Sequence, residues 1–461
     1  MDAQHHATPH SDRSAEDTAL PPAGSSDTLQ PFVEPFQEFF HAESSGGILL
    51  LAATAIALLW ANSPWGDAYH EIWQTPISIA VGPHALTETV LEWINDGLMA
   101  MFFFVIGLEI KREMLVGELA SIRQATLPVA AAIGGTIVPA GLYLAFNAGG
   151  PGSKGWGIPM ATDIAFALGV LTLLGPRIPG SLKVFLAALA IGDDLMAVMV
   201  IAIFYTSTIS WLNLGIGAIF LMLLIAANVM GVRHVLVYCV LGIGGLWLAF
   251  LLSGVHATIA GVLAAMTIPA RTKLGRGEFL ERGRALLRRF EQVTSSGTSP
   301  LANQERHQVT HRLETAVKNV ATPLQRLEHA LHPWVTLVVM PVFALANAGV
   351  TLDAGITATL SSAVAYGVIV GLLIGKPTGV LLGSAVAIRL RVASLPDGVT
   401  WLHLIGVGFL AGIGFTMSLF ITDLAFGQAD ASASAKIGIL LGSAAAGVIG
   451  WSVLRGIRAM T

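Results

Sequence analysis

Charged side chains are scarce in this chain. Asp, Glu, Lys and Arg make up 12% of its 461 residues, about half their share in an average soluble domain. Cysteine is nearly absent: Cys239 is the single one, so no disulfide framework is expected. Residues 1–30 lack the apolar segment of a signal peptide, and we expect this polar stretch to be a disordered tail, not a cleaved leader. These absences exclude a disulfide-stabilised fold and disfavour a water-soluble domain.

Apolar residues are abundant, by contrast, at 54% of the chain, with a mean hydropathy of +0.71. Apolar runs long enough to cross about 30 Å of hydrocarbon recur between residues 47 and 455. The sequence therefore predicts an all-α polytopic membrane protein with about twelve transmembrane helices. We place them at residues 47–62, 90–110, 125–147, 156–174, 182–206, 212–230, 235–252, 254–269, 334–352, 361–385, 403–426 and 435–455.

The 50 glycines fit this class, because small residues let membrane helices pack closely. The glycine-rich stretch Leu241–Gly245 follows no predicted strand, so we interpret it as a packing face and not as a nucleotide loop. No nucleic-acid partner is expected.

The predicted organisation has four parts. Residues 1–45 form the polar tail and a short interfacial helix, since phenylalanines recur at helical spacing near residues 32–40. Residues 46–269 hold spans one to eight, 270–330 form a long insertion, and 331–461 hold spans nine to twelve. With twelve spans, ten Lys/Arg residues lie in the short loops on one side of the membrane and two in the loops on the other side. Because Lys and Arg are enriched in cytoplasmic loops, both termini are predicted to be cytoplasmic.

Two loops have patterns of their own. Between the first two spans, residues Ile77–Val81 alternate with period two, and Gly82-Pro83 precedes Ala85 and Leu86, which predicts a small β-hairpin in the first outer loop. The cytoplasmic insertion 270–330 carries eleven Lys/Arg, with apolar residues at helical spacing. It forms either amphipathic helices on anionic headgroups, joined by a flexible link at Thr294–Pro300, or a partly ordered solvated loop.

Adjacent carboxylates, Asp193 and Asp194, lie in the middle of the fifth span. Ionisable groups inside a span are costly and usually face the bundle interior or a water-filled path. Neighbours on a helix are about 100° apart, so one carboxylate can face a cation path while the other meets a different partner. Burial and mutual repulsion favour protonation, so such a pair can bind either a cation or protons.

The fourth and eleventh spans carry signals of interruption. In the fourth, Pro159 removes a backbone donor shortly before Thr162 and Asp163, whose side chains can bind freed backbone groups. In the eleventh, several glycines precede Thr416 and Ser418. The tenth span contributes Lys376, which must lose its proton, reach the interface, or find an anion such as Asp163 or Asp193.

Together these segments closely resemble the NhaA-type sodium/proton antiporters of bacterial inner membranes, from about residue 40 to the C-terminus. The matching segments are Trp93–Asp96, Gly107–Glu113, Ala161–Gly169, Asp193–Asp194, Ser253–Thr258, Asn347–Gly349, Gly375–Pro377 and Gly412–Ser418.

The resemblance implies an inverted repeat in which spans four and eleven are unwound at mid-membrane and cross each other. It implies that Asp194 is central to Na⁺ or Li⁺ binding, and that Asp193 is the second essential carboxylate and pairs with Lys376. Asp163 and Lys376 would offset the facing ends of the broken helices. Exchange would be electrogenic and activated at alkaline pH, and residues Ile77–Leu86 would form the contact of a homodimer.

The resemblance also implies a pH-sensing region. It comprises Glu109, Arg112, Glu113, His256, Glu328, His329 and His332. The residues alone leave another interpretation open: Glu109, Arg112 and Glu113 have the spacing of a helix-end ion-pair cluster. This chain departs from the family pattern in the long insertion beside Glu328 and in two additional acids, Glu92 and Asp423, which either widen an outer funnel or lie at the interface.

The hypothesis from sequence is thus a secondary antiporter, neither an enzyme nor dependent on a cofactor, that exchanges Na⁺ or Li⁺ for protons across the bilayer. The alternatives are a sodium-coupled symporter for an organic anion and a cation channel. A membrane-embedded aspartyl hydrolase is disfavoured, because its two aspartates come from different helices whereas Asp193 and Asp194 are adjacent on one.

Overall fold

The computed structural model describes residues 30–82, 84–206, 209–272, 276–294, 304–351, 361–427 and 429–457. The predicted tail before residue 30, the turn residue Pro83 and the predicted link at 295–300 lie outside these ranges. The chain divides into two units, Met1–Phe39 and Phe40–Thr461, and the description below concerns the second.

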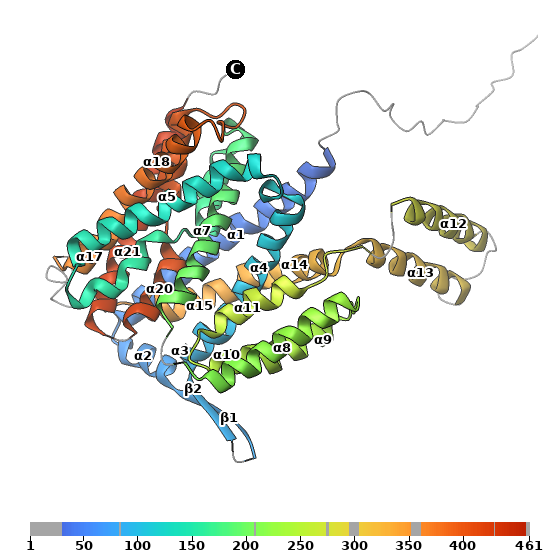
Figure 1. Ribbon diagram of the computed structural model, residues 1–461, viewed down its shortest axis with the longest axis horizontal. Coiled ribbons are helices and arrows are strands. Elements are labelled where there is room, and N and C mark those ends of the chain that lie inside the picture. The colour runs from blue at the N-terminus through green and yellow to red at the C-terminus, as the bar shows by residue number, and fades with distance from the viewer. Residues whose placement is uncertain are drawn as a thin grey trace, which may run out of the picture. The chain divides into compact units, whose positions relative to one another are not determined.

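The described residues are almost entirely helical (Figure 1). The α-helices are α1 Gln30–Ala61, α2 Gly66–Gln74, α3 Val90–Glu92, α4 Met99–Val116, α5 Ile122–Asn147, α6 Ile164–Leu173, α7 Gly180–Phe204, α8 Trp211–Val229, α9 Val235–Cys239, α10 Leu248–Leu251, α11 Ala257–Thr267, α12 Arg276–Thr294, α13 Gln304–Val320, α14 Pro323–Trp334, α15 Met340–Asn347, α17 Ala363–Val370, α18 Lys376–Arg389, α19 Trp401–Ala411, α20 Phe415–Phe426 and α21 Asp430–Gly456. Tighter 3₁₀ turns form η2 Glu118–Ala120, η3 Pro151–Met160 and η4 Gly175–Arg177, and wider π turns form η1 Trp93–Leu98, η5 Val240–Trp247, η6 Val335–Val339 and η7 Gly371–Gly375.

Many of these elements join into helices that can cross a membrane. Seven continuous helices among the described residues are long and apolar enough: Val90–Val116, Ile122–Asn147, Gly180–Phe204, Trp211–Val229, Pro323–Asn347, Ala363–Arg389 and Asp430–Gly456. The number rises to ten if each of three bent helix pairs is one span. Two shorter apolar helices, Val235–Leu251 and Ala257–Thr267, accompany them. The predicted all-α polytopic class is confirmed at this level.

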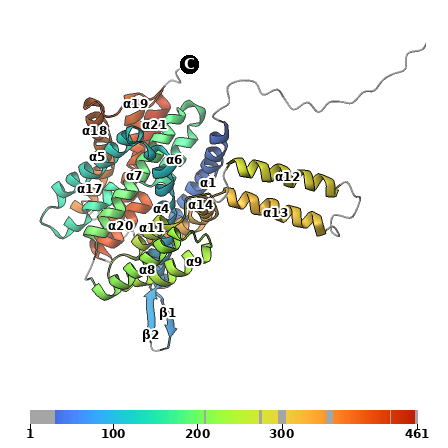
Figure 2. The same ribbon diagram turned by 45° about the vertical axis from the view of Figure 1, so that its right-hand side comes forward.

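The predicted β-hairpin is confirmed. Strand β1, Pro76–Val81, pairs antiparallel with β2, His84–Thr89, and Ile79 lies opposite Leu86. Gly82 follows β1 with φ +61°, a conformation that L side chains rarely adopt. The ribbon projects from the helices at one end of the bundle (Figures 1 and 2).

The insertion contains two helices, α12 and α13, which lie side by side in both views (Figures 1 and 2). The backbone N–H of Leu324, at the start of α14, donates to the carbonyl of Pro269, just beyond α11, at 3.2 Å. The two ends of the insertion therefore meet at the ends of two apolar helices.

Glycines allow α5 and α18 to pack backbone against backbone. A Cβ at Gly134 would lie 2.2 Å from the carbonyl oxygen of Gly379, and one at Gly383 would lie 2.1 Å from that of Ala130. Because no side chain fits between these helices, the start of α18 is held deep inside the bundle. Lys376, the first residue of α18, is fully buried there.

Candidate ion-binding site

Two bent helix pairs meet at the centre of the site. Segments η3 and α6 are bent by 42° across residues 161–163, and α19 and α20 are bent by 45° across residues 412–414. Pro159 removes a backbone donor before the first break. At the second, a Cβ on Gly414 would lie 2.2 Å from the hydroxyl of Ser418, so glycine permits the close approach there.

Asp163 joins the two breaks. Its backbone N–H donates to the carbonyl of Ile413 at 2.7 Å. One carboxylate oxygen accepts the N–H of Phe166 at 3.2 Å and so caps α6, and the other accepts the N–H of Thr416 at 3.2 Å and the Thr416 hydroxyl. Both helix N-termini, where the partial charge is positive, thus present N–H groups to one buried carboxylate.

Lys376 lies at the C-terminal end of η3, on the other side of the first break. Its ammonium group is 2.7 Å from Oδ2 of Asp193, and both side chains are fully buried. The same ammonium donates to the carbonyl of Met160, the last residue of η3. A positive charge therefore neighbours both a carboxylate and a helix C-terminus, where the partial charge is negative.

Thr162 connects α7, which carries Asp193, to Ala411 at the end of α19. Its hydroxyl oxygen lies 2.6 Å from Oδ2 of Asp193 and 2.8 Å from the carbonyl oxygen of Ala411. A hydroxyl has one proton to donate. It can therefore donate to an ionised Asp193, or donate to Ala411 while accepting a proton shared by a neutral Asp193.

Asp194 points elsewhere. It is 2% exposed, and its Oδ1 has no hydrogen-bond partner among the described residues. The side chain lines a cavity of about 50 Å³, which has room for a few water-sized species. The polar lining consists of Glu109, Thr162, Asp163, Asp194, His332 and Thr336, and the apolar lining includes Phe102, Val105, Ile106, Met340 and Met417. Hard cations prefer oxygen ligands, which this lining supplies.

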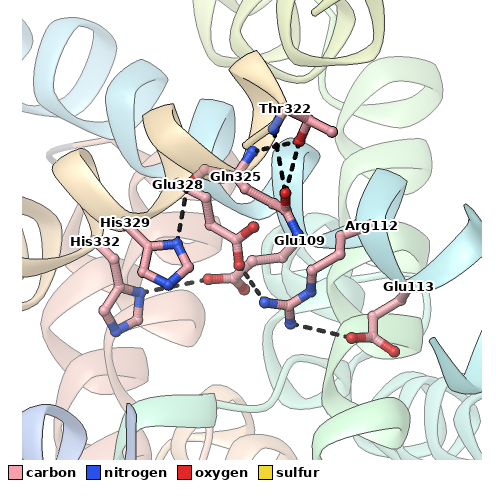
Figure 3. Close-up of polar contacts among 8 residues, drawn as sticks. All are labelled: Glu109, Arg112, Glu113, Thr322, Gln325, Glu328, His329 and His332. Carbon is pink, nitrogen blue, oxygen red and sulfur yellow. Dashed lines mark hydrogen bonds and ion pairs between the residues drawn. The ribbon is translucent and has the colours of Figure 1, made fainter. Parts of the chain in front are cut away.

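A second polar cluster joins α4 to α14 (Figure 3). The guanidinium of Arg112 forms ion pairs with Glu328 and, at 3.0 Å, with Glu113. His332 Nδ1 lies 3.5 Å from Glu109, and these two residues also line the cavity that contains Asp194. The cluster is therefore continuous with the cavity.

Just beyond α4, the backbone N–H of Glu118 donates to Glu113 at 3.0 Å. Burial, and then the charge of Glu113, raises the pKa of Glu118 above its usual range. This end of α4 thus carries several interacting acids.

The chain matches a family model described as Na⁺/H⁺ antiporter 1 over residues 37–454. It belongs to the Na⁺/H⁺ antiporter 1 family. Among curated relatives, a protein of Oleidesulfovibrio alaskensis named Na⁺/H⁺ antiporter NhaA is 51% identical over 94% of this chain and 96% of its own. Proteins of the same name from Koribacter versatilis and Acidithiobacillus ferrooxidans are 49% and 48% identical, over 92% and 91% of this chain and 92% and 96% of their own. The chain is accordingly a multi-pass membrane protein.

The structure brings together most of the residues that the sequence singles out. Thr162, Asp193 and Lys376 form one hydrogen-bonded network, the neighbouring Asp163 bonds Thr416, and Asp194 shares the cavity with Thr162 and Asp163. Of the expected pH-sensing residues, Glu109, Arg112, Glu113, Glu328 and His332 form the second cluster (Figure 3).

Two expected sensors lie apart from those ion pairs. His329 is exposed and contacts the carbonyl of Gln325 at 2.9 Å. His256 precedes α11 and contacts the carbonyl of Tyr205 at 2.7 Å. Helix α11 is eleven residues long, so its two ends are roughly 16 Å apart. His256 lies at one end, and Lys111 of α4 contacts the other.

The two additional acids have local partners. Glu92 caps α3: its carboxylate accepts the N–H of Thr89 at 2.7 Å and the Thr89 hydroxyl at 2.9 Å. Asp423 accepts the amide of Asn95 at 2.8 Å, and Asn95 in turn accepts from Asn347 at 2.9 Å. Asn95 and Asn347 thus link η1, α15 and α20. The only feature of the sequence that could indicate this role is that both residues are polar within apolar segments.

Proposed function

We propose that this chain is an electrogenic secondary antiporter that exports Na⁺ or Li⁺ from the cytoplasm in exchange for external protons, supporting sodium and pH homeostasis. The observation that carries this proposal is the position of Asp194, which lines a small cavity with Thr162 and Asp163 and has one carboxylate oxygen without a partner among the described residues. A desolvated carboxylate in this position must take up either a cation or a proton.

The proposed coupling is competition for the same carboxylates. Asp194 binds Na⁺ when ionised and a proton when not, while Asp193 either pairs with Lys376 or carries a proton. Thr162 fits both states of Asp193, because its hydroxyl has an alternative acceptor in Ala411. If both carboxylates discharge protons for each Na⁺ bound, more protons enter than sodium ions leave, and each cycle moves net charge.

Asp163 and Lys376 are proposed as charge-compensating residues. Without Asp163, the N-termini of α6 and α20 would face each other with like partial charges. Without Lys376, the C-terminal carbonyl of η3 and the carboxylate of Asp193 would face each other instead. The two residues thus permit helix breaks in a region that supplies no water to unpaired backbone groups.

The proposed architecture has twelve spans. The seven continuous helices, the three bent pairs counted singly and the two shorter apolar helices correspond in order to the twelve predicted spans. We propose that they form an inverted repeat, with spans four and eleven crossing at their breaks, in the bacterial inner membrane with both termini cytoplasmic. Rocking of the core around the fixed site would alternate its access.

We further propose that activity is switched on at alkaline pH through Glu109, Arg112, Glu113, His256, Glu328, His329 and His332. The continuity between the Arg112 cluster and the Asp194 cavity supports this role for five of them. A homodimer contact through the hairpin is also proposed, because Ile77 and Ile79 are 45% and 54% exposed on one face of β1.

The alternative functions fit less well. Pockets for organic ligands generally measure 300 Å³ or more, whereas the cavity at Asp194 measures about 50 Å³. An organic anion would also meet the carboxylates of Asp194, Asp163 and Glu109. A channel is distinguished by transport and not by geometry, since its proton movement would not follow the sodium gradient.

The proposal is tested in everted membrane vesicles with a fluorescent pH dye. Adding Na⁺ without organic solute should dequench the dye in wild type and in the matched control Asp430→Asn, which alters an exposed aspartate at the start of α21. Asp194→Asn should abolish the response. Wild-type exchange by Asp194→Asn would refute the proposal, and a requirement for organic solute would favour symport.

A further inference from the structure

The insertion that contains α12 and α13 is anchored where two spans end. Besides the hydrogen bond from Leu324 to Pro269, the ammonium of Lys111 donates to the carbonyls of Met266 and Ile268 at 2.6 and 2.5 Å. At the other end, α13 stops at Val320 and α14 begins at Pro323. Both ends of the helical pair therefore lie where apolar helices of the bundle end.

Helix α12 presents one apolar stripe to α13. Phe279, Gly283, Leu286 and Phe290 recur at spacings of four, three and four residues and are half-buried. On α13, Val309 and Ala316 are 2% and 6% exposed, with Leu313 half-buried between them. These two stripes form the seam between the helices.

A second, narrower apolar stripe lies outside that seam. Leu280 and Leu287 are seven residues apart, which places them on the same face of α12, and they are 46% and 54% exposed. Two large aliphatic side chains thus lie one above the other on the exposed side of α12, where contact with water forgoes the free energy that burial would give.

The charge around this stripe is positive. Residues 270–330 contain eleven Lys/Arg and six Asp/Glu, whereas the whole chain has a net charge of −4. Arg284 and Arg288 lie within about 80° of Leu280 around the helix, and one acid, Glu291, lies on the same side about three turns further along. Among the described side chains neither forms an ion pair, in contrast to Arg282, which pairs with Glu278 at 2.6 Å.

We propose that α12 docks on the anionic headgroups of the bilayer that the chain itself spans, with Leu280 and Leu287 entering the interface and Arg284 and Arg288 contacting lipid phosphates. Apolar residues flanked by basic ones on an amphipathic helix are the pattern that binds anionic membrane surfaces. The seven residues between Ile268 and α12 span at most about 25 Å, so the membrane is always within reach. A soluble partner would have no such constant proximity.

The test uses the full chain in lipid nanodiscs. In a Cys239→Ser background, Leu287→Cys carries a nitroxide label, and Ala285→Cys, exposed about 160° away around α12, serves as the matched control. Collision with oxygen and with a water-soluble nickel complex reports whether each label is immersed. Discs contain phosphatidylcholine alone, or equal parts phosphatidylcholine and phosphatidylglycerol.

We expect the label at 287 to become accessible to oxygen and protected from nickel only in the anionic discs, while the label at 285 remains accessible to nickel. Arg284→Gln combined with Arg288→Gln should lower the ratio of docked to free helix about thirtyfold, since each basic residue near an anionic surface contributes about 1 kcal/mol. Glutamine is a good helix former, so the helix should persist in this variant.

Several results would overturn the proposal. A label at 287 that is accessible to nickel in both kinds of disc would show that lipid does not cover this face, and would leave a soluble protein as its partner. Equal immersion in neutral discs would show that anionic headgroups are not recognised. Equal protection of both labels would show that α12 is enclosed by protein and not laid on a bilayer.

Discussion

The ammonium group of Lys376 lies 2.7 Å from the carboxylate of Asp193, and neither side chain is exposed. Taking two charges out of water is costly, and their attraction offsets that cost only when their other hydrogen bonds are satisfied. Here Met160 accepts from the ammonium and Thr162 contacts Oδ2 of the carboxylate, whereas Oδ1 of Asp193 is buried without a hydrogen-bond partner among the described residues. This ion pair and the breaks in the two helices are therefore mutually dependent.

Removing one member of the pair should destabilise the protein. Lys376→Met leaves the carboxylate of Asp193 and the carbonyl of Met160 without their partner, which costs about 3–5 kcal/mol for a buried pair. We expect a clear fall in the midpoint of thermal unfolding in detergent, measured by intrinsic fluorescence. Combining Lys376→Met with Asp193→Asn should recover much of the loss, because no buried charge is then left unpaired. A double variant as unstable as Lys376→Met would contradict the pairing.

The hydroxyl of Thr162 should contribute to ion binding. Thr162→Val keeps the shape but removes the contacts with Asp193 and Ala411. A hydrogen bond to a charged group is worth about 1.5–3 kcal/mol, so the sodium concentration for half-maximal exchange should rise about tenfold or more. Thr172→Val is the matched control, since among the described residues that hydroxyl bonds only the carbonyl of Leu168, one turn back on α6. Equal effects in the two variants would argue against a specific role.

Arg112 should set the pH at which exchange becomes active. It pairs with Glu328, which is 4% exposed, and the same cluster reaches the cavity through Glu109. With Arg112→Gln, a smaller fraction of Glu328 is ionised at a given pH, because the guanidinium that pairs with its carboxylate is removed. If activation requires that ionised form, the pH of half-maximal exchange moves upward. The exposed Arg123→Gln is the control, and an unchanged profile in both would show that the cluster is only structural.

The apolar face of the hairpin should hold a dimer together. Ile77 and Ile79 point to one side of β1, whereas Ser78 points to the other and contacts the hydroxyl of Thr87 at 2.8 Å. Ile79→Asp should convert the dimer to monomer in size-exclusion chromatography with light scattering, and Ser78→Asp should not. A monomeric wild type, or a dimer unaffected by Ile79→Asp, would refute this contact.

Much of the site was predictable, because placing a charged residue in an apolar membrane segment costs free energy and such residues are therefore easily recognised in the sequence. Asp163, Asp193 and Lys376 are charged residues within apolar segments; the structure pairs Asp193 with Lys376 and places Asp163 at the adjoining helix N-termini. The 100° offset between neighbours also explains why Asp193 meets Lys376 while Asp194 faces the cavity. The hairpin was predictable from its alternation and its glycine turn.

The backbone partners were not predictable. Met160, Ala411 and Ile413 take part through their carbonyl groups, which every residue has, so the side chains carry no signal. The contact between Lys376 and Met160 also spans 216 residues of sequence. Only the folded arrangement of the two broken helices determines which carbonyls face the charges. The local capping role of Glu92 depends likewise on where α3 begins.

Competition between Na⁺ and protons has a direct consequence for pH dependence. If ionised Asp194 is the form that binds Na⁺, each added proton displaces the cation, and the apparent affinity for Na⁺ falls as pH falls. With one competing proton the fall approaches tenfold per pH unit, and with two it is steeper. Binding curves measured across pH by calorimetry should show this slope, and an affinity independent of pH would exclude shared carboxylates.

The most direct test of the central claim is to measure protons released when Na⁺ binds to the purified protein in weakly buffered detergent solution, using a pH dye. At a pH low enough for the Na⁺-free carboxyls to be mostly protonated, the account predicts release of at least one proton per Na⁺ bound. Asp194→Asn should bind no Na⁺ and release none, while Asp430→Asn should behave as wild type. Binding of Na⁺ without proton release, or undiminished release in Asp194→Asn, would contradict it.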